Sequence, residues 1–414
     1  IVSAAAAAEK GFDVVCYDPD PARIGSLVRN RLPVSEPGLA ELVASNGERL
    51  RFTGEAGDLE PCDLVYIAGD VSTDDHGTSD LKPVVSLIEG VAKGLDGGAL
   101  LVILCQVPPG FCRGLRRDAA NTYYQVETLI FGKAVERALF PERIIVGCAD
   151  PTRPLPPQYD TFLGAFACPV LSMRLESAEL AKISINMFLV ASVSTTNILA
   201  ELSERIGADW AEIVPALRLD KRIGEHAYLT PGLGLAGGNL ERDLATAIRL
   251  GDAHGTDVGT VRAWRFNSRH RRYWALHVLH ETVLAGNPAA TIAVLGLAYK
   301  PDTESIKNSP AVALIDALRA FKVRVYDPLV GPRPEWHPAL ETVAGPLETC
   351  MGADVLVVMT PWKEFGDIDP RDIAAALAGR TLIDPFGVFD GDACAAAGLD
   401  HHRLGVGRGL IETN

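Results

Sequence analysis

The first 28 residues, "IVSAAAAAEKGFDVVCYDPDPARIGSLV" (1–28), decide the fold class. An alanine-rich helical pattern stops at Gly11, and a short apolar run then leads into Asp18. A strand that ends in an acidic residue and is followed by another helix forms the later part of a β–α–β unit. We therefore expect a parallel sheet, with a first strand and a glycine-rich turn belonging immediately before residue 1.

The same alternation continues along the next 150 residues. Helical patterns separate four strand-like runs, "CDLVYIA" (62–68), "ALLVILCQV" (99–107), "RIIVGCA" (143–149) and "CPVLSM" (168–173). Strand patterns stop at about Leu175, where "SAELAKISINMFLVASVSTTNILAELSERIG" (177–207) begins. This segment is apolar around most of a helix, which is typical of a helix buried between domains or in a dimer interface.

The β–α–β pattern starts again at Thr291. Its strand-like runs are "TIAVLGLAYKPDT" (291–303), "VRVYDP" (323–328), "ADVLVVMT" (353–360) and "TLIDPFG" (381–387). Alternating strands and helices indicate an α/β fold with helices on both sheet faces. We predict two Rossmann-like, doubly wound parallel-sheet domains joined by a central helical domain, with boundaries at 1–174, 175–288 and 289–414.

Composition narrows the class of partner. Lys and Arg number 39 against 53 Asp and Glu, a net charge of −14, so we expect no nucleic acid partner. No uninterrupted apolar run reaches the roughly 18–20 residues of a membrane span, and we expect no membrane partner. The eight cysteines form no C-x-x-C pair, which favours a cytoplasmic protein with reduced thiols and no metal site.

Several segments together resemble the UDP-glucose/GDP-mannose dehydrogenase family of nucleotide-sugar oxidoreductases, over essentially the whole chain. The segments "YDPDPARI" (17–24) and "EPGL" (36–39) carry this resemblance in the first domain. It implies an NAD-binding N-terminal domain in which Asp18, Arg23 and Gln106 contact the cofactor. An acidic residue at position 18 favours NAD over NADP, because it accepts hydrogen bonds from the ribose hydroxyls.

The resemblance also implies a catalytic group. The segment "QVETLIFGKAVERALFPERIIVG" (125–147) is similar to a family segment that places a glutamate, here Glu127, near the sugar. The central helix places Lys182 and Asn186 four residues apart, on one helix face. A cation and an amide can stabilise the alkoxide that forms when an alcohol loses a hydride.

Substrate contacts follow from three further segments. In "LRLDKRIG" (217–224) the candidate is Arg222, and in "GLAYKPDTESIKNSP" (296–310) it is Lys300, a candidate partner for the diphosphate and also for the cofactor. The glycine-rich loop in "TPGLGLAGGNLERDL" (230–244) adds Gly234 and Gly237. The resemblance implies a C-terminal domain that binds a nucleotide sugar, and a central domain that carries catalysis and forms a homodimer.

One position departs from the family pattern in a way that changes the chemistry. The family loop has a cysteine followed by a Lys-Asp pair, whereas this chain has Asn239, then Arg242 and Asp243. The cysteine traps an aldehyde covalently during a second oxidation, and an amide cannot do so. Cys105 lies in a predicted strand and Cys112 beyond a Pro-Pro turn, so we do not expect either to replace it.

Other departures lie in loops. Gln106 stands where the family has a threonine, Phe386–Gly387 where an arginine is usual, and Lys307 where an arginine is common. After the strand at 62–68, where the family commonly has a V-x-T-P turn, this chain has an acidic loop, which is interpreted as solvated, with a polar substrate or a cation as the alternative. Its members are Asp70, Asp74, Asp75 and Asp80.

The favoured function is a single two-electron oxidation of a nucleotide sugar, giving an aldehyde or a ketone. We expect Lys182, Asn186, Asn239, Asp243 and Glu127 to be the catalytic residues, and Arg222, Gly234, Gly237, Arg242 and Lys300 to contact the substrate. Three alternatives stay open. They are a four-electron oxidation through a gem-diol, a nucleotide-sugar-binding protein without turnover, and an epimerase-like enzyme that returns its hydride.

Overall fold

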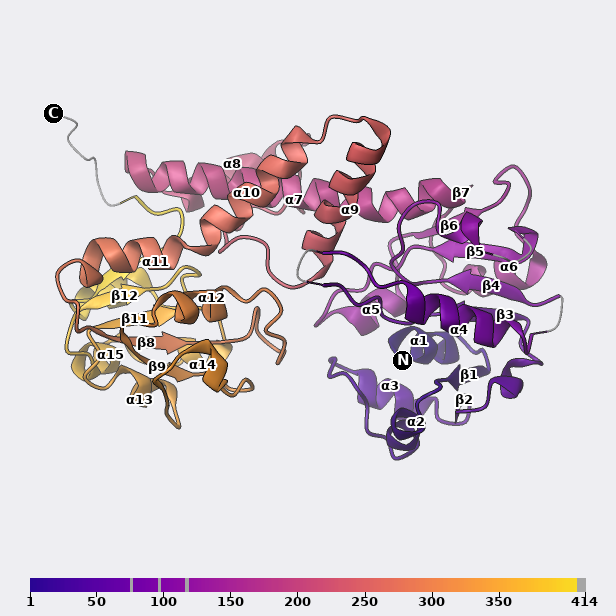
Figure 1. Ribbon diagram of the computed structural model, residues 1–414, viewed down its shortest axis with the longest axis horizontal. Helices are drawn as coiled ribbons and strands as arrows, with labels where there is room; N and C mark the ends of the chain where they lie inside the picture. Colours follow the sequence, from indigo (N-terminus) through magenta and orange to yellow (C-terminus); the bar gives the residue numbers. More distant parts are fainter. Residues whose placement is uncertain (75–76, 96–97, 116–118, 408–414) are drawn as a thin grey trace. The chain divides into compact units, whose positions relative to one another are not determined.

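The computed structural model describes residues 1–74, 77–95, 98–115 and 119–407. The chain forms two compact units, residues 1–185 and 186–414. Helix α7 (Leu175–Ile206) runs through the boundary between them (Figure 1). It begins directly after strand β7 (Val170–Arg174), at the position where the strand patterns in the sequence stop.

The first unit contains two sheets. β1 and β2 pair in parallel, and five further strands are ordered β3-β4-β5-β6-β7. The elements before β7 are α1 (Val2–Glu9), β1 (Val14–Tyr17), α2 (Pro21–Val28), α3 (Leu39–Ser45), β2 (Leu50–Thr53), η1 (Ala56–Leu59), β3 (Leu64–Ile67), α4 (Lys82–Ala92), β4 (Leu100–Ile103), η2 (Cys112–Gly114), η3 (Ala119–Asn121), β5 (Thr122–Gln125), α5 (Ala134–Leu139), β6 (Ile144–Cys148) and α6 (Pro157–Gly164).

Strand β4 is an inner strand of the five-stranded sheet and is covered on both faces. Leu101 and Ile103 pack in one core cluster with α4 and the start of α7, whereas Leu100 and Val102 pack with α6 in another. All four residues are buried, because alternate side chains of a strand point to opposite faces. A strand buried on both faces reads as a continuous apolar run, which is why "LLVI" was recognisable.

One pair of strands departs from the parallel order that the sequence predicts. β5 and β6 are antiparallel, with Tyr124 opposite Gly147 and Gln125 opposite Val146. In an antiparallel pair the second strand enters at the end where the first one leaves, so residues 126–143 need not cross the sheet. The predicted parallel sheet is confirmed, and β5–β6 is one antiparallel pair within it that the sequence did not show.

In the second unit, helices precede a single sheet. The helices are α8 (Trp210–Leu219), α9 (Asn239–His254), α10 (Gly259–Arg272), α11 (Trp274–Leu279) and the π-helical turn η4 (His280–Leu284). α9 and α10 pack against each other. Val190 of α7 and Leu244 of α9 belong to one buried cluster, which fixes the start of α9 beside α7 within this unit.

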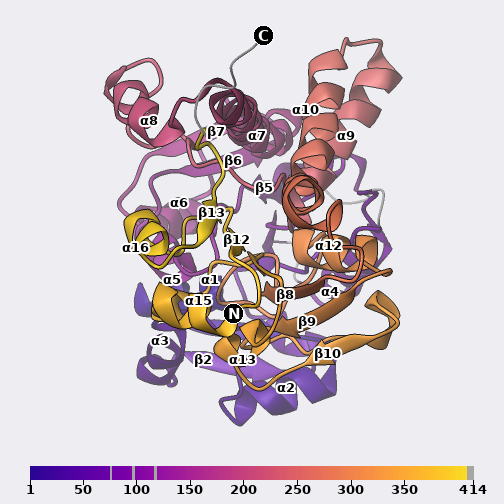
Figure 2. The same ribbon diagram turned by 90° about the vertical axis from the view of Figure 1, so that its left-hand side faces the viewer.

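The sheet of the second unit has six parallel strands in the order β10-β9-β8-β11-β12-β13. Figure 2 shows α12 on one side of it and α13, α15 and α16 on the other. The elements are β8 (Thr291–Leu295), α12 (Pro310–Ala317), β9 (Lys322–Tyr326), η5 (Pro334–Trp336), β10 (Leu340–Thr342), α13 (Pro346–Cys350), β11 (Val355–Val358), α14 (Lys363–Gly366), α15 (Pro370–Ala376), β12 (Thr381–Ile383), α16 (Gly391–Ala396) and β13 (Asp400–His402).

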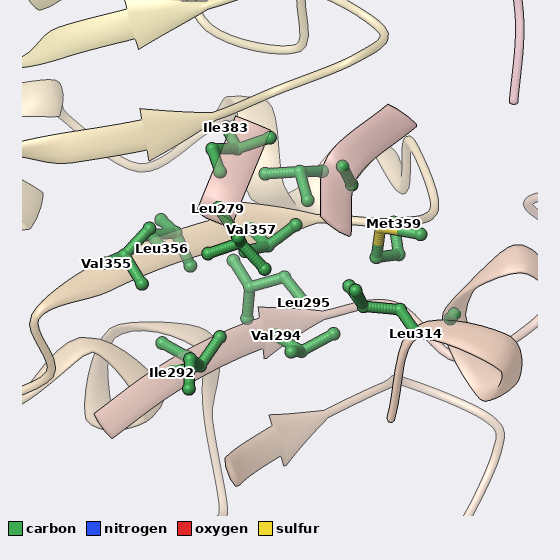
Figure 3. Close-up of a cluster of buried hydrophobic side chains, with 14 of the residues drawn as sticks. Leu279, Ile292, Val294, Leu295, Leu314, Val355, Leu356, Val357, Met359 and Ile383 are labelled. Carbon is green, nitrogen blue, oxygen red and sulfur yellow. The ribbon is translucent and has the colours of Figure 1, made fainter. Parts of the chain in front are cut away.

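The largest core cluster fills the space around β8 and β11. Figure 3 shows Leu279 of α11 and Leu314 of α12 among the strand residues Leu295 and Val357. These four side chains are at most 3% exposed. Burial of one such side chain contributes about 1.5–3 kcal/mol, so this cluster holds the sheet and its two helices as one body.

Helix α7 is more continuously apolar than the sequence pattern indicated. It contains an 18-residue window long and apolar enough to cross a membrane, and 39% of that window is buried inside the protein. A helix packed in a protein core meets the same criteria of length and composition. The continuous helix tolerates occasional hydroxyl and amide side chains, which had broken the apolar run in the sequence.

Candidate active site

The glycine-rich loop before α9 requires glycine at two positions. Gly234 has φ +77°, and a Cβ there would lie 2.2 Å from the carbonyl oxygen of Ser268 in α10. Gly237 has φ +79°, and its Cβ would lie 3.2 Å from the Tyr299 ring. Positive φ and close backbone approach both favour glycine. The loop is therefore held between α10 and the segment after β8, and it delivers Asn239 as the first residue of α9.

Asn239 is hydrogen-bonded to a buried cation. The Nη2 of Arg242 donates to Oδ1 of Asn239 at 3.1 Å, and Arg242 is only 5% exposed. Its Nε lies 3.9 Å from Oδ1 of Asp243. A buried guanidinium is stable only where acceptors surround it, so Asn239 and Asp243 are part of its solvation.

Asp243 joins α9 to α7. Nδ2 of Asn186 donates to Oδ2 of Asp243 at 2.5 Å, and the two residues are 7% and 2% exposed. The structure thus brings four sequence-predicted residues into one hydrogen-bonded network, in which Asn186, Asp243 and Arg242 are buried and Asn239 is exposed. This network combines a carboxylate, a guanidinium and two amides.

In the first unit, Lys182 and Glu127 are neighbours. Nζ of Lys182 donates to the backbone oxygen of Glu127 at 2.8 Å, and Oγ of Ser3 donates to its carboxylate at 3.1 Å. Burial raises the pKa of the Glu127 carboxyl, while the Ser3 hydrogen bond and the Lys182 charge lower it. A raised pKa suits a carboxyl group that exchanges protons near neutral pH. Ser3 was not singled out from the sequence, because its contact spans 124 residues.

The carboxyl end of β1 carries the residues expected to bind the adenosine ribose. Nη1 of Arg23 donates to Oδ2 of Asp18 at 2.8 Å, and the Asp20 amide donates to Oδ1 at 2.9 Å. These contacts orient a carboxylate whose side chain remains 22% exposed. A carboxylate at this strand end fits a dinucleotide. Gln106 follows β4 in the same unit and is partly buried.

In the C-terminal sheet, the order of successive strands reverses between β8 and β11. A ligand in such a fold binds outside the carboxyl ends of these two strands. Gly296 follows β8 with φ +90°, and a Cβ there would lie 2.4 Å from Cβ of Thr360. The Thr360 hydroxyl donates to the Ala298 carbonyl at 2.6 Å. Close contact between the two strand ends therefore needs a glycine at position 296.

Asp327, at the end of β9, binds the amides that follow this glycine. Its Oδ2 accepts from Leu297 N at 2.6 Å, from Ala298 N at 3.1 Å and from Nε1 of Trp362 at 3.1 Å. Because the Asp327 carboxylate already accepts from these amides, a phosphate here would need a nearby cation. Lys300 lies in the same segment, with Nζ 5.8 Å from the centre of the Tyr299 ring. The sequence reading missed Asp327.

The remaining predicted residues have solvent-exposed surroundings. The Arg222 side chain is 89% exposed and makes two bonds to Asp220, from Nε at 3.0 Å and Nη2 at 2.6 Å. Asp74 and Asp80 accept hydrogen bonds from loop amides at 2.8 and 3.1 Å, as expected for a solvated turn, and Asp75 lies outside the described residues. Gly387 is covered by Arg403, whose Cδ would lie 3.5 Å from a Cβ at that position.

All eight cysteines are free thiols, and burial is the largest cause that raises the pKa of each one. The pKa reaches about 12 for Cys105 and Cys350 and about 11 for Cys394. The pKa of Cys112 is also raised by the Glu179 carboxylate beside it. A catalytic thiol needs a lowered pKa, so these groups are poor nucleophiles.

A carboxylate at the end of β1, a lysine beside a partly buried glutamate and a doubly wound C-terminal sheet are features of a dinucleotide-dependent oxidoreductase. Three models of one family match successive parts of the chain, its NAD binding domain at residues 1–154, its central domain at 176–269 and its UDP binding domain at 293–391. The chain belongs to the UDP-glucose/GDP-mannose dehydrogenase family, and it is an NAD-dependent oxidoreductase of the nucleotide-sugar dehydrogenase class.

Relatives match along nearly the whole chain. UDP-glucose 6-dehydrogenase TuaD of Bacillus subtilis is 28% identical over 98% of this chain and 90% of its own length. UDP-glucose 6-dehydrogenase of Rhizobium meliloti is 29% identical over 98% and 97%. A UDP-glucose dehydrogenase from Pyrobaculum islandicum has a TM-score of 0.81 at 28% identity, covering 95% and 94%. The structure of UDP-D-ManNAc dehydrogenase from Pyrococcus horikoshii has a TM-score of 0.83 at 24% identity over 98% and 96%, which shows the fold alone.

Proposed function

We propose that this chain oxidises an alcohol of a UDP-sugar, or of a close analogue, by a single two-electron step to an aldehyde or a ketone. The observation that carries this proposal is the state of residue 239. Its amide oxygen is bound by the buried Arg242 guanidinium, and the thiols of the chain have raised pKa values. A second oxidation in this family proceeds through a covalent thiohemiacetal, which a thiol forms with the aldehyde, and here no reactive thiol is available to form it.

The first oxidation needs no covalent step. NAD, when bound, supplies the hydride acceptor. Lys182 stabilises the alkoxide as the hydroxyl proton leaves, and Asn186, one turn later on α7, donates a hydrogen bond. Asp243 orients the Asn186 amide through their 2.5 Å bond and with it holds a water molecule, and Asn239 orients the sugar. Glu127, with its raised pKa, takes up the proton.

Binding roles follow the two doubly wound sheets. We assign Asp18, Arg23 and Gln106 to NAD. We assign Lys300 to phosphate, which it meets as a point charge, and the loop glycines Gly234 and Gly237 to close approach of the sugar nucleotide. Two arginines complete the assigned substrate contacts, Arg222 and Arg242.

A four-electron oxidation is the second candidate, and the Glu127 carboxyl favours it. The aldehyde would add water to form a gem-diol, Glu127 or Asp243 would remove a proton, and the carbon would give up a second hydride to a second NAD. This route gives a carboxylate and two NADH without a thiol. We rank it below the single oxidation because it needs a base that acts twice.

We further propose that the protein works as a homodimer in the cytoplasm. Helix α7 carries exposed apolar residues in the second unit, including Leu202 at 51% and Ile206 at 54% exposure. Contiguous apolar surface of this kind is typical of a protein–protein interface. Eight free thiols are typical of a reducing compartment.

The deciding experiment counts NADH formed per sugar consumed, with NAD and a panel of UDP-, TDP- and GDP-sugars, and records product mass with an aldehyde trap. One NADH and a product two mass units lighter would support the proposal, and the trap separates aldehyde from ketone. Two NADH and a carboxylate would establish the gem-diol route. Tight binding without NADH would point to a binding protein or to an epimerase-like enzyme.

A further inference from the structure

The glycine-rich loop before α9 is bonded to the segment after β8 at several points. Nδ2 of Asn308 donates to the Gly237 carbonyl at 2.7 Å, and the Gly237 amide donates to the Lys307 carbonyl at 3.0 Å. Nδ2 of Asn308 also donates to the carboxylate of Glu241 in the first turn of α9. Asn308 therefore binds Gly237, two positions before Asn239, and Glu241, two positions after it.

The acceptor on α9 is itself fixed. Oε1 of Glu241 pairs with Nη2 of Arg272 in α10 at 3.0 Å. Burial raises the pKa of Glu241, and the Arg272 charge lowers it. A half-buried carboxylate with one cationic and one amide partner is a stiff connection, because the loss of either partner would leave it poorly solvated.

Asn308 adopts a backbone conformation that is unusual outside glycine, with φ +53°. Such a conformation persists where the surroundings determine it, and here two side-chain bonds and one backbone bond do so. Asp302, in the same segment, also has positive φ at +59°, but it is exposed and provides a matched comparison.

The segment 296–308 has a second role through its position. It leaves β8 at the strand end where a ligand of a doubly wound sheet binds, and it carries Lys300. The two partners of Asn308, Gly237 and Glu241, lie on either side of Asn239. Glu241 directly precedes Arg242 and Asp243, which belong with Asn239 to the hydrogen-bonded network at the start of α9. One segment thus contacts both the nucleotide region and the network that orients the sugar.

We propose that Asn308 is a positioning residue that couples binding of a nucleoside diphosphate at the C-terminal sheet to the placement of Asn239. The inference rests on the proposed function only for the role of Asn239. A bound diphosphate orders the segment 296–308, and the amide of Asn308 transmits this order to the glycine loop and α9. Coupling of this kind is reciprocal and typically changes an affinity or a population by about 5–150-fold.

The test compares Asn308→Gly with Asp302→Gly. Both variants accept positive φ, so the backbone is relaxed equally, and only the first removes the amide. UDP is titrated calorimetrically, and amide hydrogen exchange of residues 231–243 is followed with and without UDP. For Asn308→Gly we expect UDP affinity to fall by about 5-fold, because the coupling is reciprocal, while binding persists, because Asn308 does not bind the nucleotide itself. We expect exchange protection of 231–243 by UDP to fall at least about 5-fold, as the coupling range implies.

Turnover adds a second readout. With a sugar that wild type oxidises, Asn308→Gly should lower kcat and raise KM by no more than the fall in UDP affinity, and Asp302→Gly should leave both unchanged. Unaltered protection of 231–243 in Asn308→Gly would overturn the proposal, as would loss of UDP binding, since either shows that the residue does not couple the two regions. Because hydrogen exchange does not depend on catalysis, it tests the coupling even if the protein does not carry out the proposed reaction.

Discussion

At the scale of single residues, the pairing of Asn239 with Arg242 bears most directly on the proposed chemistry. The buried guanidinium needs the Asn239 oxygen as an acceptor. Residues 239 and 242 therefore form one unit, and substitution at one position alters the surroundings of the other. The pair gives the end of the loop a hydrogen-bonded amide at position 239.

Asn239→Ala should destabilise the protein by about 1–3 kcal/mol, because it removes an acceptor of the buried Arg242 guanidinium. Asn239→Asp keeps an acceptor and adds a negative charge at the start of α9, where the helix dipole favours one, so we expect wild-type stability. Urea unfolding of both variants checks this. Equal stability of Asn239→Ala and wild type would show that Arg242 does not depend on residue 239.

Glu127 gives a prediction about pH. Its pKa is raised in the folded protein, so the folded state holds its proton more tightly than the unfolded state does. Stability linked to this group is therefore full below the unfolded pKa of about 4.3 and is lost as pH rises through the folded value. Glu127→Gln, which carries no charge, should gain stability relative to wild type as pH increases from about 4 to 8. Parallel pH profiles of the free energy of unfolding for the two proteins would contradict this.

The sequence predicted these residues unequally. Lys182 and Asn186 were singled out through the family resemblance, and their four-residue spacing places both on one helix face. Their partners were not, since Asn186 bonds Asp243 57 positions later and Lys182 bonds a backbone oxygen. Asn308 and Glu241 escaped notice because they are ordinary polar residues whose meaning depends on tertiary contacts.

At the scale of elements, the loop from Gly232 to Gly238 is a tightly fitted connection. Gly234→Ala should destabilise the protein by about 1–3 kcal/mol from backbone strain, in addition to a clash with Ser268. Gly232→Ala is the matched control, because a Cβ there meets nothing within 4 Å. Thermal unfolding and NADH production should separate the two variants. If both behaved alike, the packing against α10 would not hold the loop.

Strand and helix patterns predicted most of the architecture, because strands buried on both faces give continuous apolar runs. The antiparallel pair of β5 and β6 was not predictable, since local sequence carries no signal for strand direction. The short strands β10 and β13, with three residues each, also lay below what a pattern can show. Elements of this length depend on their neighbours for stability.

At the scale of the whole molecule, dimerisation through α7 is testable. Exposed Leu199, Leu202 and Ile206 are spaced three and four residues apart, on one helix face. Leu202→Glu should convert a dimer into a folded monomer, because a charge would have to be buried in an apolar interface. Met351→Glu, at a more exposed position (62%) on α13's C-cap, should stay dimeric. Light scattering reports both masses, and a monomeric wild type would refute the proposal.

The raised thiol pKa values have a consequence for the conditions in which the protein can work. A protonated, buried thiol reacts slowly with hydrogen peroxide and with alkylating electrophiles. We expect turnover to survive treatment with iodoacetamide at a dose that inactivates an enzyme dependent on a reactive cysteine. Turnover that depends on none of these eight thiols would therefore continue under conditions that oxidise a reactive cysteine.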